Sequence, residues 1–162
     1  TLGHFGDGLA PTRVSKAFAK SAGFSWGSDA AFDMLDCNTL ASGDADVINT
    51  TLQLILPCLD KVKVLASLTG ERISLAPNAP TMGELNPELN ISLWNGLFVR
   101  KGTPQDVRDK IVASAQKTVM GARARAVAEE TGALVYWMSA KESADQISKD
   151  IQTMERISNL LN

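Results

Sequence analysis

The feature that most constrains the fold is a regular alternation of short apolar runs and amphipathic segments in the first half of the chain. Residues 1–5, 24–26, 46–49 and 61–68 are predicted to be strands, because they are short and are rich in apolar or β-branched side chains. Segments with helical periodicity lie between them. This βαβαβ order predicts an α/β fold in which helices cover both faces of a parallel or mixed sheet.

Glycines and small polar residues mark the expected ends of the helices in this half. The first helix is predicted over residues 11–22, with Gly23 as its stop. Ser28 or Asp29 is expected to cap the second helix, which Gly43 ends.

Two threonines are expected to cap further helices. Thr50 begins a short helix that ends near Pro57. Thr103 begins a longer helix, with Pro104 at its first position and Asp106 in its first turn, where a negative charge suits the helix N-terminus.

The second half is predicted to add two more strands and two more helices. Residues 70–92 contain three prolines and lack a sustained period, so they are expected to form a connecting loop. Strands are predicted over 91–99 and 133–138, and helices over 122–131 and from the capping box at 139–142 onward. The buried stripe expected on the helix that Thr103 caps consists of Val107, Ile111, Ala115 and Val119.

Composition excludes two classes of function. The chain has 162 residues, 44% of them hydrophobic, and a formal net charge of -2, so it has no basic excess with which to bind nucleic acid. No apolar run approaches the roughly 20 residues that span a bilayer. The chain opens at Thr1 without an initiator methionine or signal peptide, as a mature, engineered or fragmentary chain would.

Few residues have the chemistry of a catalytic or metal site. Cys37 and Cys58 are too far apart in sequence for a metal or redox motif, and we expect two small buried side chains, or a disulfide in an oxidising compartment. His4 is the single histidine, and it could serve a small α/β hydrolytic enzyme together with an aspartate. The aspartates at 29, 33 and 36 have helical spacing without histidines, which favours a solvated helix face over a metal site.

The stronger indication is the position of three loops. In a doubly wound sheet, ligands bind beyond the carboxyl ends of the strands, where helix N-termini present free N–H groups. Residues 6–9, 27–29 and 49–51 are expected to follow strands, so they could form one cup for a small polar or anionic ligand. Ordinary capped turns are the alternative.

Several motifs, in order along the chain, resemble the Bug family of periplasmic solute receptors, which serve tripartite tricarboxylate transporters. The segment "SLWNGLFVRKGTPQDVRDKI" at 92–111 resembles a strand-to-helix junction of that family. Upstream, "KVKVLASLTGERISLAPNAPTMGEL" and "ASGDADV" resemble further family segments, and "FGDGLAP" and "FSWGSDAAF" resemble its ligand loops. Trp26, Asp7 and Arg100 depart from the residues that the family usually has.

The resemblance implies a periplasmic-binding-protein-like (type II) fold with a doubly wound mixed sheet. Family members are two-domain clamshells about twice as long, so this chain would be a truncated half. Residues 1–92 would form the second, ligand-binding lobe. Residues 93–162 would be the crossover strand and the C-terminal helices that complete the first lobe.

By the same resemblance, the second-lobe loops would hold a ligand carboxylate through backbone amides and small hydroxyl groups. The residues carried over, with Trp26 as a possible stacking face, are Gly6, Asp7, Gly8, Leu9, Trp26, Gly27, Ser28, Asp29, Asn49 and Thr50. Asp7 would repel an anion about 4 Å away by up to ~4 kcal/mol. It could therefore cap a turn away from the ligand, bind a cationic or zwitterionic ligand, or sit beside an uncharged or aromatic one.

The function that follows is capture of a small organic solute, such as a carboxylate or aromatic acid, by a periplasmic receptor that delivers it to permease subunits. No cofactor is implied. The alternatives are a sensor of the same fold that acts on a signalling partner, and the hydrolytic enzyme. Because a half-clamshell exposes apolar surface, self-association through the incomplete lobe is expected.

Overall fold

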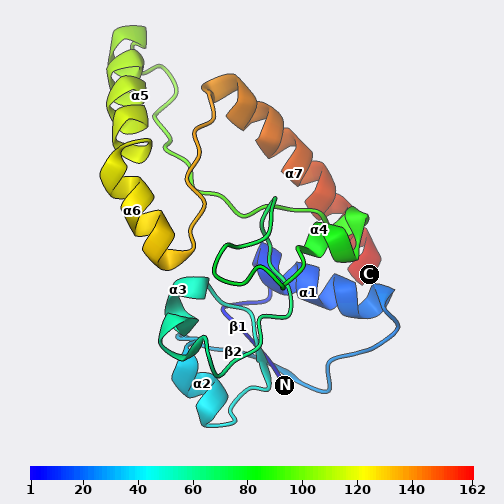
Figure 1. Ribbon diagram of the computed structural model, residues 1–162. Helices are drawn as coiled ribbons and strands as arrows, with labels where there is room; N and C mark the ends of the chain where they lie inside the picture. Colours follow the sequence, from blue (N-terminus) through cyan, green and yellow to red (C-terminus); the bar gives the residue numbers. More distant parts are fainter.

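The computed structural model describes all 162 residues and contains a three-stranded parallel sheet at the N-terminal end of the chain (Figure 1). The central strand is β1 (Leu2–His4), with β2 (Asp29–Ala31) on one side and β3 (Val47–Ile48) on the other. Leu2 is in register with Asp29 and with Val47. The mixed α/β class is therefore confirmed, but the sheet is smaller than predicted and purely parallel.

The two faces of the sheet are packed differently. Gly3 leaves space for side chains on one face, since a Cβ at this position would lie 2.9 Å from Leu35 Cδ2 and 3.1 Å from Ala45 Cβ. Helix α2 (Cys37–Ala41) follows Leu35, and α1 (Ala10–Ser21) lies against the opposite face (Figure 1). A side chain at position 3 would thus push apart the segments that cover this face.

The main apolar core lies between α1 and the C-terminal helix α7 (Ala140–Leu161). Two short helices, α4 (Met82–Leu85) and η2 (Pro87–Leu89), close the same core from the middle of the chain. Its fully or largely buried members are Val14, Ala17, Met82, Leu89, Ile91 and Ile157.

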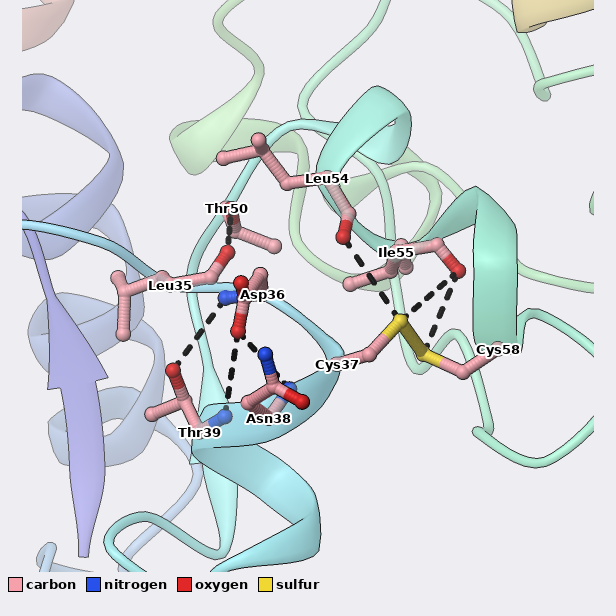
Figure 2. The surroundings of a disulfide bond; sticks show 9 residues. All are labelled: Leu35, Asp36, Cys37, Asn38, Thr39, Thr50, Leu54, Ile55 and Cys58. Carbon is pink, nitrogen blue, oxygen red and sulfur yellow. Dashed lines mark hydrogen bonds between the residues drawn. A yellow bond between two sulfur atoms is a disulfide. The ribbon is translucent and has the colours of Figure 1, made fainter.

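A disulfide joins Cys37, at the start of α2, to Cys58, at the end of the single turn η1 (Leu56–Cys58) (Figure 2). The Cα atoms are 5.9 Å apart. Both cysteines are half-buried, so the expectation of two reduced, buried side chains is wrong and the alternative holds. A bridge that closes a loop of this size stabilises the folded state by about 3 kcal/mol, and it is compatible with an extracytoplasmic location.

The expected strand at 24–26 and the helix after it are wrong. The strand lies at Asp29–Ala31, and the following helix begins only at Cys37. Asp36 caps that helix, because its carboxylate accepts hydrogen bonds from the backbone N–H groups of Asn38 and Thr39 (Figure 2). Phe24 and Trp26, which suggested a strand, instead stack edge to face beside α1.

The strands expected at 61–68, 91–99 and 133–138 are also absent. The first of these segments forms only one isolated bridge, between Ser67 and Thr81. Residues 94–99 and 133–138 make no backbone hydrogen bond through N–H groups. Their alternating apolar sequences suit strands, but no neighbouring strand is there to pair with them.

The helix predictions are mostly confirmed. Helices lie at α1, at α6 (Ala122–Thr131) and at α7, and the last has the expected capping box of Ser139 and Glu142. The cap predictions at two threonines are wrong. Thr51 rather than Thr50 precedes α3 (Leu52–Ile55), and Pro104 rather than Thr103 precedes α5 (Gln105–Val119). In both cases the threonine hydroxyl donates to a backbone carbonyl instead.

Helices α5 and α6 follow one another end to end along one side of the molecule (Figure 1). Neither helix buries a residue, so the expectation of a buried stripe on α5 is wrong: Val107 and Ile111 are 39% and 38% exposed. No helix in the structure has both the length and the apolar character needed to cross a membrane.

An ion pair between Arg72 and Glu84 holds the connection of residues 70–92 in place. Both residues belong to the segment "KVKVLASLTGERISLAPNAPTMGEL" that resembles a family motif. The Arg72 guanidinium donates to both carboxylate oxygens of Glu84, and Thr81 N–H donates to the same carboxylate. The hydrogen bonds from Arg72 are the main reason that the pKa of Glu84 is lowered to about 2. These two motif residues therefore have a structural role.

Replacing Gly132 with alanine should destabilise the fold. Gly132 ends α6 with φ +69°, and a Cβ there would lie 2.6 Å from Leu52 Cδ2. Left-handed backbone and overpacking together should cost about 2 kcal/mol. The measurement is urea unfolding, with Gly70→Ala as control because a Cβ at Gly70 meets open space. Equal stability losses in the two variants would contradict this account.

Candidate functional site

The candidate site is the carboxyl edge of the sheet, where the loops after the three strands are held together by side chains. Asn49, just after β3, donates through Nδ2 to the Pro11 carbonyl and to Ser15 Oγ of α1, both at 2.8 Å. Thr50 Oγ1 donates to the Leu35 carbonyl in the loop after β2, at 2.7 Å (Figure 2). Asn49 and Thr50 thus join the loop after β3 to each of the other two connections.

The third predicted loop does not reach this edge. Since β2 begins at Asp29, Gly27 and Ser28 precede the strand and lie at the amino edge of the sheet. The Leu2 N–H donates to the Ser28 carbonyl at 2.9 Å, and the hydroxyls of Thr1 and Ser28 are 2.7 Å apart. The expectation that residues 27–29 follow a strand is wrong, because the strand was placed five residues too early.

A large open hollow extends from the sheet towards α5 and α7, with a volume of about 2120 Å³. Of the predicted ligand residues, Trp26, Asn49 and Thr50 line it, whereas residues 6–9 and 27–29 do not. The rest of its wall is largely apolar. It includes parts of residues 61–68, 91–99 and 133–138, the three segments that were expected to be strands but are not. One of these carries Trp94, whose Nε1 donates to Asp150 Oδ2 of α7 at 2.7 Å.

Asp7 and Asp29 belong to a compact ionic cluster beside α1. Lys16 Nζ lies 2.7 Å from Asp7 Oδ1 and 2.5 Å from Asp29 Oδ2, and His4 Nε2 lies 3.0 Å from Asp29 Oδ2. Hydrogen bonds from Lys16 first, and from His4 second, lower the pKa of Asp29. The same two carboxylates, Asp29 first, raise the pKa of Lys16.

The pairing with Lys16 bears on the three alternatives for Asp7. Its carboxylate accepts a hydrogen bond from Lys16 and caps no turn. The Lys16 ammonium, which Asp7 shares with Asp29, offsets part of this negative charge. Lys16 was missed in the sequence because nothing in its helical segment distinguishes it from the neighbouring Arg13 and Lys20; only the fold brings it between the two carboxylates.

His4 is buried, and its two ring nitrogens have different surroundings. Its Nδ1 is buried without a hydrogen-bond partner, while Nε2 faces Asp29. No hydroxyl or thiol is hydrogen-bonded to His4, and a hydrolytic nucleophile beside a base is therefore not formed here.

Three further aspartates near the sheet have partners within the chain. Asp36 caps α2, Asp44 accepts from Ser42 Oγ at 2.6 Å, and Asp46 binds the N-terminal ammonium of Thr1. The one group of possible metal ligands, His4, Asp7 and Asp29, surrounds the Lys16 ammonium, which already supplies a positive charge there.

Comparisons with family models, with curated proteins and with solved structures give no match to this chain.

The ionic cluster predicts how stability depends on pH. Because the pKa of Asp29 is lower in the folded chain than in the unfolded one, its stabilising contribution is present above about pH 4 and is lost as pH falls through the lowered value. Asp29→Asn should flatten the fall in unfolding free energy as pH drops below about 4. Urea unfolding at several pH values measures this.

The matched control is Asp33→Asn, since Asp33 is exposed and makes no ion pair. It should follow the wild-type pH dependence. An Asp29→Asn profile as steep as that of the wild type would show that the cluster does not contribute to acid stability.

Proposed function

We propose that this chain is the ligand-binding part of an extracytoplasmic solute receptor of the Bug type, with a type II periplasmic-binding-protein fold. It captures a small organic solute, a carboxylate or aromatic acid, and delivers it to the permease of a tripartite tricarboxylate-type transporter. The ordered motifs over 61–111 and the parallel sheet with ligand loops at its edge support this proposal.

The observation that carries the proposal is the position of Trp26, Asn49 and Thr50. All three were selected from the sequence as ligand residues, and all three line the same hollow. A tryptophan face and a fixed polar side chain on one concave wall are what a solute with an apolar body and a polar group needs. Asn49 is held in place by its two hydrogen bonds to α1, so little ordering remains to be done on binding.

The size of the hollow limits where the solute sits. Small-molecule pockets are about 300–1,000 Å³, so a solute would occupy only the end next to the sheet. The rest is the space that a second lobe fills in a clamshell. Closure of such a lobe over the solute is the hinge motion by which the ligand favours the closed state.

The disulfide agrees with an extracytoplasmic receptor, because such bonds persist in oxidising compartments. It also holds the connection after β2 to the segment after β3 (Figure 2), which are the two loops that Thr50 joins. The ligand edge is thus made rigid by a covalent bond outside the hollow.

The test is isothermal titration of the chain with a panel of aliphatic dicarboxylates and tricarboxylates and of aromatic acids. At least one should bind with 1:1 stoichiometry and be recovered unchanged. Trp26→Leu should weaken that binding about tenfold, the loss expected for one aromatic contact.

Trp137→Leu is the matched control, since Trp137 also lines the hollow but lies in the 133–138 segment. It should leave the affinity within about twofold. Binding of no acid on the panel, or an equal loss in both variants, would contradict the proposed site, and turnover of the solute would favour an enzyme.

A further inference from the structure

A second cavity lies where the connection from α6 to α7 passes the segment that leads to α5 (Figure 1). Its volume is about 380 Å³, and small-molecule pockets are about 300–1,000 Å³. Gly70 and Glu71 line this cavity but not the hollow, whereas Trp94 and Tyr136 line both. A Cβ at Gly70 would meet open space, so the cavity is open on this side. We call it the Glu71 pocket.

The charge of the pocket wall is negative. Glu71 is the only charged residue that lines it, and its side chain makes no ion pair and no hydrogen bond within the chain. The neighbouring Arg72 does not neutralise it, because the guanidinium binds both carboxylate oxygens of Glu84 and the Pro77 carbonyl. A cavity with one free carboxylate and no cation in its wall favours a positively charged occupant.

Trp94 gives the pocket an aromatic wall that is held in place. Its Nε1 donates to Asp150 Oδ2 at 2.7 Å, and Gln146 Nε2 donates to Asp150 Oδ1 at 2.8 Å. The indole is therefore already ordered before a ligand arrives. Because Asp150 binds only these two neutral donors and forms no ion pair, its negative charge remains beside the indole and also favours a cation.

The rest of the wall suits alkyl groups. Tyr136, which is 45% exposed, supplies a second aromatic ring. Leu134 and Met138 add apolar surface. Aromatic faces attract cations through the ring quadrupole, and this is how proteins bind quaternary ammonium groups. A wall of this kind fits the methyl groups of an alkylated ammonium ion better than the three N–H donors of a bare one.

We propose that the Glu71 pocket binds a quaternary ammonium group, with Trp94 and Tyr136 against its methyl groups and the Glu71 carboxylate balancing its charge. This site stands apart from the proposed solute site, because Trp26 and Asn49 do not line the pocket and Glu71 does not line the hollow. Failure of one proposal therefore leaves the other standing.

The experiment is isothermal titration of the whole chain at low ionic strength with choline and with its neutral isostere, 3,3-dimethyl-1-butanol. Choline should bind with 1:1 stoichiometry and at least about tenfold more tightly than the isostere, since the two differ in charge and hardly in shape. Equal affinities, or no binding of choline up to about 10 mM, would overturn the proposal.

Variants place the binding in the pocket. Glu71→Gln should weaken choline binding about fivefold and Tyr136→Leu about threefold. Glu88→Gln is the matched control, because Glu88 is an exposed glutamate without an ion pair that lines neither cavity. Equal affinities in Glu71→Gln and Glu88→Gln would overturn the assignment.

Two further arms separate the possible sources of the ammonium group and the two sites. Co-sedimentation of the wild type, but not of Glu71→Gln, with phosphatidylcholine vesicles would assign the group to a lipid headgroup. Binding of choline without co-sedimentation would assign it to a free small molecule. Glu71→Gln should leave the binding of an organic acid near Trp26 unchanged, because Glu71 does not line the hollow.

Discussion

The packing of α7 on α1 is the interaction on which the rest of the structure depends. It joins the last helix of the chain to the first and buries Val14, Ala17 and Ile157 completely. Burial of Val14 and of Ile157 stabilises the fold by about 1.5–3 kcal/mol each, and burial of the single methyl group of Ala17 by less. Arg13 Nη2 also donates to Ser158 Oγ at 2.8 Å. Because the other side of α1 covers the sheet, this one contact holds the sheet and the C-terminal helix in a single body.

The segment between the core and α7, residues 94–138, buries much less of its apolar surface. Helices α5 and α6 and the extended segments on either side of them are held mainly by contacts near their ends. Gly132 fits against Leu52, and Trp94 is bonded to Asp150. Between these points, large apolar side chains such as Leu97 and Phe98 are 72% and 75% exposed. The N-terminal half and α7 are thus closely packed, whereas residues 94–138 expose many large apolar side chains.

Local sequence signals predicted α1, α6, α7 and several helix ends, because caps and periods are properties of a few neighbouring residues, although the caps expected at Thr50 and Thr103 were wrong. The capping box at Ser139 and the glycine stops after α1 and α2 are examples. Strands depend on partners that are distant in the sequence, and most of the strands predicted from local composition are absent. Asp29–Ala31 has a poor composition for a strand, yet it pairs with β1 because the backbone of β1 is available to it.

The candidate site was predictable in the same uneven way. Asn49 and Thr50 could be placed at the carboxyl edge because β3 was located correctly. Ser28 was expected at the same edge but lies at the opposite one, because the strand expected before it, at residues 24–26, is at Asp29–Ala31 instead. The role of Lys16 is visible only after folding, since nine residues separate it from Asp7 and thirteen from Asp29. Ionic clusters of this kind form through tertiary structure, which no local pattern records.

The measurement that tests this account most directly is hydrogen exchange of the backbone amides, followed by mass spectrometry in dilute solution. The amides of α1 and of the C-terminal half of α7 should exchange slowly, because global unfolding is needed to expose them. Peptides covering 94–99 and 133–138 should exchange at nearly the rate of an unfolded chain, since their N–H groups have no backbone partner. Strong protection of those two segments in dilute monomer would contradict the account, because it would show that they are paired strands and that the chain closes its second half by itself.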